Sequence, residues 1–154
     1  MTQQLTSETR PKSQGLLLVE ISATPQHVAI LYRLLTAREH RISHTHMPTF
    51  DEHRLFVQSH PYRAWYLIKR GARYIGSVYF THLNSIGIFV MPSAKNYLTA
   101  ALKLALAKHR PLPSIKSVRT HSFDFNISPN DAYLAAALEE IGAKCVQVTY
   151  SLKK

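Results

Sequence analysis

Histidine side chains are the first candidates for proton transfer in this sequence, because their pKa lies near neutral pH. His82 and His121 fall within or beside the predicted central strands, and no aspartate or glutamate occurs between residues 53 and 123. A general base on these strands would therefore have to be His82 or His121. The alternative is that each is a surface histidine, or one whose ring is satisfied by a structural hydrogen bond.

Four further histidines, His40, His44, His46 and His53, lie close together in the sequence. Their spacing matches no common zinc signature and no cysteine accompanies them, so we predict that no metal is bound. Cys145 is the only cysteine, which excludes an intramolecular disulfide and favours a reducing, cytoplasmic location. Its apolar neighbours are typical of a buried thiol.

The charge of the chain is strongly positive, with a formal net value of +10. Its carboxylate-free stretch, residues 53–123, should create a field that attracts polyanions, and a phosphate-rich cofactor and a nucleic acid both fit. Aromatic residues interleave with basic ones at 62–79 and could stack on single-stranded bases, but no nucleic-acid-binding motif is present. The basic residues of the stretch are Arg54, Arg63, Lys69, Arg70, Arg73, Lys95, Lys103, Lys108, Arg110, Lys116 and Arg119.

The chain has 154 residues, which suits a single domain with a substantial core. Residues 1–15 are polar and lack the apolar segment of a signal peptide, so we predict a flexible tail followed by one domain at 16–154. No apolar run approaches the roughly 20 residues that a membrane-spanning helix needs, so we expect no membrane association.

The first half of the domain reads as a strand, two helices and three strands. Thr24 and Pro25 form a cap and a first helical position, and Thr49 and Glu52 form a capping box for the second helix. A glycine-containing loop at 69–73 predicts a hairpin, and Asn84-Ser85 predicts a second tight turn. The predicted elements are a strand at 16–21, a helix at 25–38, a helix from 49 to about 60, and strands at 64–68, 74–80 and 86–90.

The second half reads as helix, strand, helix and strand. A helix begins after Pro92 and ends before Pro111, a strand covers 115–125, a helix opens at 129–131 and stops at Gly142, and a strand covers 145–152. The complete order, β-α-α-β-β-β-α-β-α-β, predicts an α/β fold with a mixed sheet and helices on both faces.

Several short segments resemble one subgroup of the GNAT family of N-acetyltransferases, and they follow the order in which that family carries them. The resemblance covers residues 16–152 and implies the GNAT fold, together with transfer of an acyl group, usually acetyl, from coenzyme A to a primary amine. The segments are RISH at 41–44, MPTFDEH at 47–53, PYRAWYLI at 61–68, YIGSVYFT at 74–81, IGIFV at 86–90, NISPN at 126–130 and QVTY at 147–150.

The resemblance also implies an acetyl-CoA site along the fourth strand and at the start of the following helix. In the family, a glycine-rich loop holds the pyrophosphate there through backbone N–H groups at the helix N-terminus. Here the loop is residues 93–98, and Asn96 and Leu98 occupy both glycine positions. The implied cofactor-binding residues are Ile88, Phe89, Val90, Lys95, Asn96, Tyr97, Leu98, Thr99 and Asn130.

The catalytic positions that the resemblance implies are also altered. Ser85 stands where similar sequences commonly carry a glutamate, which leaves His82 and His121 as the candidate bases. The family's tyrosine acid corresponds to Leu138, and Tyr133 lies five residues earlier. Tyr133 is therefore the candidate acid, with the alternative that it packs against the core or the cofactor channel.

The resemblance places His44 and His53 in the wall of the acceptor site, and Tyr62 and Trp65 are further candidates for binding the substrate. Two functions remain open. The first is an N-acetyltransferase that acts on a small-molecule or protein amine. The second is an inactive GNAT-derived binding module that uses its basic face for a protein or a nucleic acid. A homodimer is compatible with either function.

Overall fold

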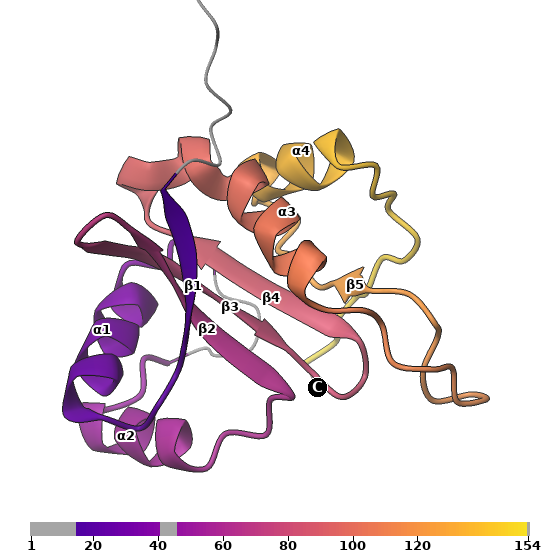
Figure 1. Ribbon diagram of the computed structural model, residues 1–154. Helices are drawn as coiled ribbons and strands as arrows, with labels where there is room; N and C mark the ends of the chain where they lie inside the picture. The colour runs from indigo at the N-terminus through magenta and orange to yellow at the C-terminus, as the bar shows by residue number, and fades with distance from the viewer. Residues whose placement is uncertain (1–14, 41–45, 154) are drawn as a thin grey trace, which may run out of the picture.

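The computed structural model describes residues 15–40 and 46–153 (Figure 1). Residues 1–14 of the predicted tail, His44 and Lys154 lie outside the described residues. The elements are, in order, β1 (Leu16–Glu20), α1 (Pro25–Thr36), α2 (Phe50–Gln58), β2 (Ala64–Arg70), β3 (Arg73–Phe80), β4 (Ser85–Val90), the 3-10 helix η1 (Pro92–Tyr97), α3 (Leu98–Lys108), β5 (Asp124–Phe125) and α4 (Ala132–Glu140).

The strands form one mixed sheet in the order β1-β2-β3-β4-β5. The first four strands are antiparallel to their neighbours, and β5 runs parallel to β4. Gly71 has a φ of 57° in the β2–β3 turn, a left-handed conformation that glycine adopts without steric cost. The structure therefore confirms the predicted α/β class with a mixed sheet.

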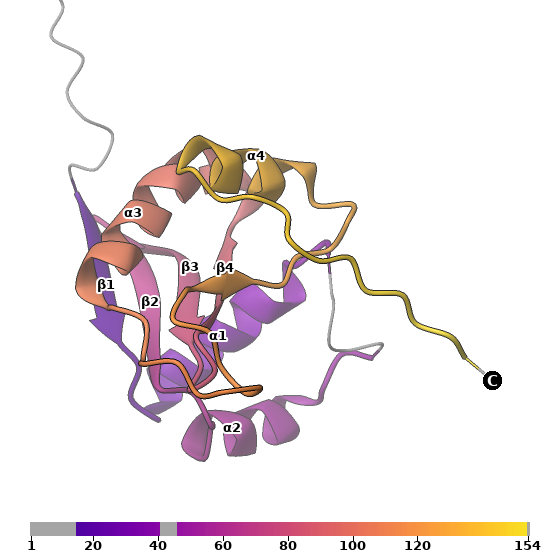
Figure 2. The ribbon, with the colours of Figure 1, turned by 90° about the vertical axis from the view of Figure 1, so that its right-hand side faces the viewer.

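Helices cover both faces of this sheet, with α1 and α2 on one side and α3 and α4 on the other (Figure 2). Strand β2 shows the consequence most clearly. Tyr66 and Ile68 pack in the core beneath α3 and α4, whereas Trp65 and Leu67 pack against α1 and α2. Because successive side chains of a strand point to opposite faces, both sets are buried and the strand reads as a continuous apolar run.

The predicted helix starts are confirmed at α1 and α2. The Thr24 hydroxyl accepts a hydrogen bond from the His27 amide at 3.3 Å, and the Thr49 hydroxyl accepts one from the Glu52 amide at 3.2 Å. The Glu52 carboxylate in turn accepts from the Thr49 amide at 2.8 Å, which completes the capping box. These local bonds set the direction in which α2 leaves the loop.

Strands β4 and β5 separate after two paired positions, Ser85 with Asp124 and Ile86 with Phe125. The fully buried side chain of Asn84, just before β4, organises this junction. Its Oδ1 accepts from the Leu112 amide at 2.7 Å, and its Nδ2 donates to the carbonyls of Leu112 at 3.0 Å and Thr120 at 2.8 Å. One side chain thus holds both ends of the loop that precedes β5.

The predicted strand at 115–125 was wrong over most of its length, since only β5 is extended and paired with the sheet. Ile115 and Arg119 instead close a turn with a short bridge, and Ser117 has a φ of 61° inside it. Ile115 and Val118 are exposed. Because Asn84 holds the backbone at both Leu112 and Thr120, the intervening residues loop outward and cannot continue along the sheet.

The predicted closing strand at 145–152 is also not formed in the described chain, and Cys145 is exposed rather than buried. In Figure 2 this segment runs away from the body of the domain. Its alternating apolar side chains remain in solvent, with Val146 and Tyr150 exposed by 85% and 92%. The edge strand β5 is extended over two residues only, so it offers little backbone with which this segment could pair.

Two helix boundaries also differ from the prediction. The helix after Pro92 opens with η1 before α3 begins. Helix α4 starts at Ala132, directly after the predicted opening at 129–131, and Asp131 is its N-cap. Gly142 ends α4 with a φ of 91°, as its position predicted. Within residues 15–40 and 46–153, no helix combines the length and apolarity needed to span a membrane.

Candidate active site

The separation of β4 from β5 exposes one backbone edge of β4. Phe89 pairs with Ser77 on β3, and the Met91 amide donates to the Ile75 carbonyl at 2.7 Å. Since alternate residues of an antiparallel strand direct their N–H and C=O groups to opposite sides, the amides of Ile88 and Val90 point away from β3. They face the side where β5 has already ended, so this edge offers hydrogen-bond donors to a bound group.

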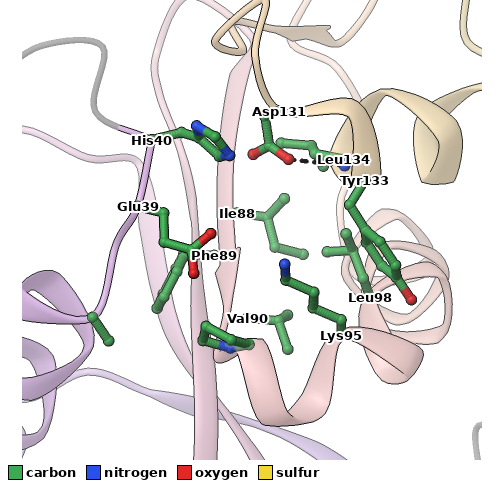
Figure 3. Close-up of a pocket in the computed structure, with 12 residues that line it drawn as sticks. Glu39, His40, Ile88, Phe89, Val90, Lys95, Leu98, Asp131, Tyr133 and Leu134 are labelled. Carbon is green, nitrogen blue, oxygen red and sulfur yellow. Dashed lines mark hydrogen bonds between the residues drawn. The ribbon is translucent and has the colours of Figure 1, made fainter.

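A small cavity of about 60 Å³ lies beside this open edge. Figure 3 shows Lys95 extending into the space between Ile88 and Tyr133. The ammonium of Lys95 lies 5.6 Å from the centroid of the Tyr133 ring, which brings the last turn of η1 close to the start of α4. The predicted residues that line this cavity are Ile88, Phe89, Val90, Lys95, Leu98 and Tyr133.

The 92–97 segment does not form a loop of free backbone N–H groups. The Ala94 amide donates to the Met91 carbonyl at 2.8 Å, and the Leu98 amide donates to the carbonyl of Lys95. The 3-10 helix therefore uses amides that a pyrophosphate would need. Leu98 itself is 6% exposed and packs in the core beneath α3, so a buried side chain fills the position at which the resemblance implies a glycine.

The other predicted cofactor-binding residues make different contacts. Asn96 is exposed. The Arg70 guanidinium lies over the ring of Tyr97, 4.5 Å from its centroid, in a cation–π contact. The Thr99 hydroxyl donates to the Glu140 carboxylate of α4 at 2.9 Å. Asn130 is an exposed turn residue whose amide donates to the Ser128 hydroxyl, and it lines neither the small cavity nor the larger cleft.

A much larger cleft of about 650 Å³ opens between α1, α2 and the middle of the sheet. Its wall includes the predicted substrate residues His53, Tyr62 and Trp65, together with the β4 segment from Ile86 to Phe89. The cleft therefore reaches the open backbone edge of β4, and Ile88 and Phe89 border both the cleft and the small cavity. A group bound at one is adjacent to a group bound at the other.

Aromatic rings form much of the cleft wall. Tyr62 and Tyr79 are stacked, with centroids 4.1 Å apart and planes 10° apart. Trp65 meets Tyr62 edge-on at 5.1 Å, and Phe56 meets Trp65 at 6.0 Å. Gly87 lies opposite Tyr79 on β4, and a side chain there would overlap the Tyr79 ring. The wall is therefore a packed aromatic surface that extends from α2 to β4.

Burial changes the acid–base properties of this wall. It raises the pKa of Tyr62 to about 12, with a further contribution from neighbouring Tyr79, because the phenolate is poorly solvated. Burial also lowers the pKa of His53, opposed by a hydrogen bond with the Val28 backbone. His53 Nε2 and Trp65 Nε1 are buried and have no protein partner among the described residues, so a bound polar group could satisfy them.

The two predicted bases lie away from these cavities. His82 is exposed, and its backbone carbonyl accepts a hydrogen bond from Arg119 at 2.8 Å. The His121 ring is also exposed and lies 3.2 Å from the Leu112 carbonyl. Neither residue lines the cleft or the small cavity. Their surroundings are those of surface histidines, which was the alternative to a role as general base.

Sequence reasoning missed Gly87 and Asp131. Asp131 borders both the cavity and the cleft while its carboxylate caps α4 by accepting from the Leu134 amide at 3.0 Å. A glycine inside an apolar strand signals the close approach of another group, and this signal could have identified Gly87. Asp131 carried only the signal of a helix cap. Among the described residues, no group of His, Cys, Asp or Glu side chains is arranged to hold a metal ion.

No protein-family model matches the chain, and no curated protein matches its sequence. Solved structures do match its fold. A probable GNAT-family acetyltransferase from Chromobacterium violaceum is 19% identical, with a TM-score of 0.58, over 86% of this chain and 78% of that one. A possible acetyltransferase from Clostridium difficile 630 is 11% identical, with a TM-score of 0.54, over 92% and 99% of the two chains.

A third similar structure is AAC(6')-Iy in complex with the bisubstrate analog CoA-S-monomethyl-acetylneamine. It is 14% identical, with a TM-score of 0.53, over 90% of this chain and 98% of that one. At these identities the likeness concerns the fold, which is GNAT-like. The order and pairing of β1 to β4, followed by a parallel β5 that separates from β4, are the features that place the cleft and the open edge.

Proposed function

We propose that the protein transfers an acyl group, usually acetyl, from a coenzyme A thioester to a primary amine. The observation that carries this proposal is the open edge of β4, where the Ile88 and Val90 amides face a gap that connects with the large cleft. An acyl donor along the edge and an amine in the cleft would meet at Ile88 and Phe89. The similar structure that holds a CoA-linked analog supports this class of donor.

The donor arm fits the open edge because an amide-containing chain can pair with strand N–H and C=O groups. The phosphate end has a different basis. Since η1 already uses its amides, side-chain charge at Lys95 takes the place of a backbone cradle. We therefore expect weaker binding than a glycine-rich loop would provide, and a marked dependence on ionic strength.

In the proposed reaction the neutral amine attacks the thioester carbonyl, the C–S bond breaks, and an amide and a free thiol are formed. The developing oxyanion is stabilised by the backbone N–H groups of Ile88 and Val90. The amine loses its proton to solvent through the open cleft, and the leaving thiolate takes up a proton from solvent. The Tyr133 ring, 5.6 Å from the Lys95 ammonium, lies instead beside the proposed phosphate end of the donor. Catalysis rests on positioning and on oxyanion stabilisation rather than on a strong protein base.

A second candidate function is a binding module without transfer activity, which would use the basic surface for a protein or nucleic-acid partner. The observation that favours it is that many of the described basic side chains are exposed and lack an ion pair. Within the described chain Arg54 forms an ion pair with Asp51 at 3.5 Å, whereas six other basic residues of the 53–123 stretch are exposed and form no ion pair with a described carboxylate. These six are Arg70, Arg73, Lys103, Lys108, Arg110 and Lys116.

Calorimetric titration with acetyl-CoA, followed by a thiol-release assay with an amine panel, separates the two functions. The enzyme predicts saturable binding and amine-dependent appearance of free thiol. Absence of binding at millimolar acetyl-CoA would refute it. The binding module predicts retention of the protein on single-stranded nucleic acid at low salt and release as salt is raised. Loss of retention in a variant with Arg70 and Arg73 replaced by glutamine would assign it to this surface.

A further inference from the structure

We propose that the acceptor amine of the large cleft is a monoamine with a flat, aromatic-sized apolar body, and that polyamines are excluded. This inference rests on the proposed function, because it names the substrate class of the same site. It follows from three properties of the cleft: the composition of its wall, the state of its carboxylates and its volume.

The wall supplies a surface for a flat apolar group. The Tyr62–Tyr79 stack and the edge-on contact of Trp65 with Tyr62 hold three rings in fixed positions. Phe89 also lines the cleft on β4, next to the proposed site of acyl transfer, with the Arg38 guanidinium 5.3 Å from its ring centroid. Aromatic groups bind such surfaces through offset or edge-to-face contacts, which a flexible aliphatic chain cannot make.

The cleft has few carboxylates with which to pair several ammonium groups. Among the described residues that line it, the acidic side chains are Glu52 and Asp131. Each is already engaged in a helix cap, since Glu52 accepts from the Thr49 amide at 2.8 Å and Asp131 from the Leu134 amide at 3.0 Å. Spermidine, with three ammonium groups, would therefore desolvate more positive charge than the two carboxylates can neutralise.

The volume of the cleft also suits a monoamine of this kind. At about 650 Å³ it is within the range of pockets that enclose small organic ligands. A short alkylamine would leave most of the aromatic wall uncovered. An arylalkylamine would cover it and still direct its amine towards Ile88.

The test uses the full-length protein and its own fluorescence. Trp65 is the only tryptophan of the sequence and lies in the cleft wall, so its emission reports binding there. The probes are 2-phenylethylamine, propylamine and spermidine, each titrated without acyl donor at fixed ionic strength and at a pH where each is protonated. We expect a saturable change with 2-phenylethylamine at concentrations at which the other two have no effect. Equal or tighter binding of spermidine would overturn the proposal.

Variants identify the surface that is used. Tyr62→Ala removes one ring of the stack and is expected to weaken 2-phenylethylamine binding by about 2- to 12-fold. Tyr74→Ala is the matched control, because Tyr74 belongs to the neighbouring strand and lies outside the cleft lining. Equal effects of the two substitutions, each checked for folding by circular dichroism, would contradict the proposal.

A gain of function provides a test that does not depend on removing a core ring. Phe56 lies on the cleft wall and is 42% exposed, so a polar side chain is tolerated there. Phe56→Glu should bind spermidine about 1.4- to 5-fold more tightly than Phe56→Gln, because it adds the missing carboxylate. Identical spermidine affinities of these two variants would count against charge as the basis of exclusion.

Binding and turnover together separate the two proposals. Binding of 2-phenylethylamine without thiol release in the presence of acetyl-CoA would refute the transferase and leave the ligand class intact. Thiol release with spermidine but not with 2-phenylethylamine would refute the ligand class and leave the transferase intact.

Discussion

Replacing Gly87 by alanine tests how β4 and the aromatic wall are joined. Gly87 pairs with Tyr79, and the added Cβ would overlap the far end of the Tyr79 ring rather than any backbone atom. The ring must therefore swing away, while the strands keep their register. Because Tyr79 is stacked on Tyr62 with centroids 4.1 Å apart, this movement breaks the stack.

The expected cost follows from these contacts. Forcing a side chain into a packed site typically costs about 1–3 kcal/mol, within which loss of the aromatic pair contributes about 0.5–1.5 kcal/mol. Alanine also restricts the unfolded chain, which offsets about 0.4–1 kcal/mol. We therefore expect the free energy of unfolding to fall by about 1–2 kcal/mol, and the melting temperature by about 2–4 °C for each kcal/mol.

A double-mutant cycle with Tyr79→Ala, measured by urea unfolding, isolates the cause. In the Tyr79→Ala background there is no ring to displace, so Gly87→Ala should be neutral or slightly stabilising. Gly71→Ala is the control, since its cost arises from a φ of 57° in an open turn and should be the same in both backgrounds. An equal cost of Gly87→Ala with and without the Tyr79 ring would refute this account of the wall.

Three further predictions concern the edge, the helix start and pH. Ile88→Pro removes an amide that β3 does not use, so the rate of thiol release should fall about 10²–10³-fold. The free energy of unfolding should fall less than in Phe89→Pro, which breaks a hydrogen bond between β3 and β4. Equal destabilisation by the two substitutions would show that the open edge of β4 is assigned incorrectly. Leu98→Gly should lower the free energy of unfolding by at least about 2 kcal/mol, because the side chain is 6% exposed; unchanged stability with tighter acetyl-CoA binding would instead mean that this leucine blocks the donor. Because the pKa of His53 is lowered in the folded protein, the unfolded chain takes up a proton there first as the pH falls. The contribution of His53 to the free energy of unfolding is therefore complete above pH ~6.5 and is lost as the pH falls towards the folded pKa. His53→Asn should reduce this pH dependence in urea unfolding measured between pH 7.5 and 5, and an unchanged slope would assign the effect to other histidines.

Local sequence signals predicted the elements that depend on nearby residues. The Thr24 and Thr49 caps act within three residues, so their chemistry is visible in the sequence and both helix starts were predicted correctly. The hairpin at Gly71 is of the same kind. In contrast, Asn84 acts over more than 25 residues on Leu112 and Thr120, and no periodicity reveals such a contact. The strand predicted at 115–125 was wrong for this reason.

The candidate site shows the same division. His53, Tyr62 and Trp65 were selected from the sequence, and all three line the cleft. His82 and His121 were selected because the central stretch lacks carboxylates, but composition does not determine direction, and both are exposed away from the cleft. The strand pairing decides which side chains and amides face a common space.

The sequence by itself determined the α/β class, most strands and helices, the positive charge and the absence of glycines at 93–98, because each depends on residue types and short-range spacing. Only the tertiary structure decided that β5 ends after two residues and that Leu98 packs in the core. Because β5 ends there, the amides of Ile88 and Val90 point to a side of β4 on which no described strand is paired beyond Ile86. These features depend on which distant segments meet, and the energy of such contacts is set by packing and hydrogen-bond geometry rather than by local preference.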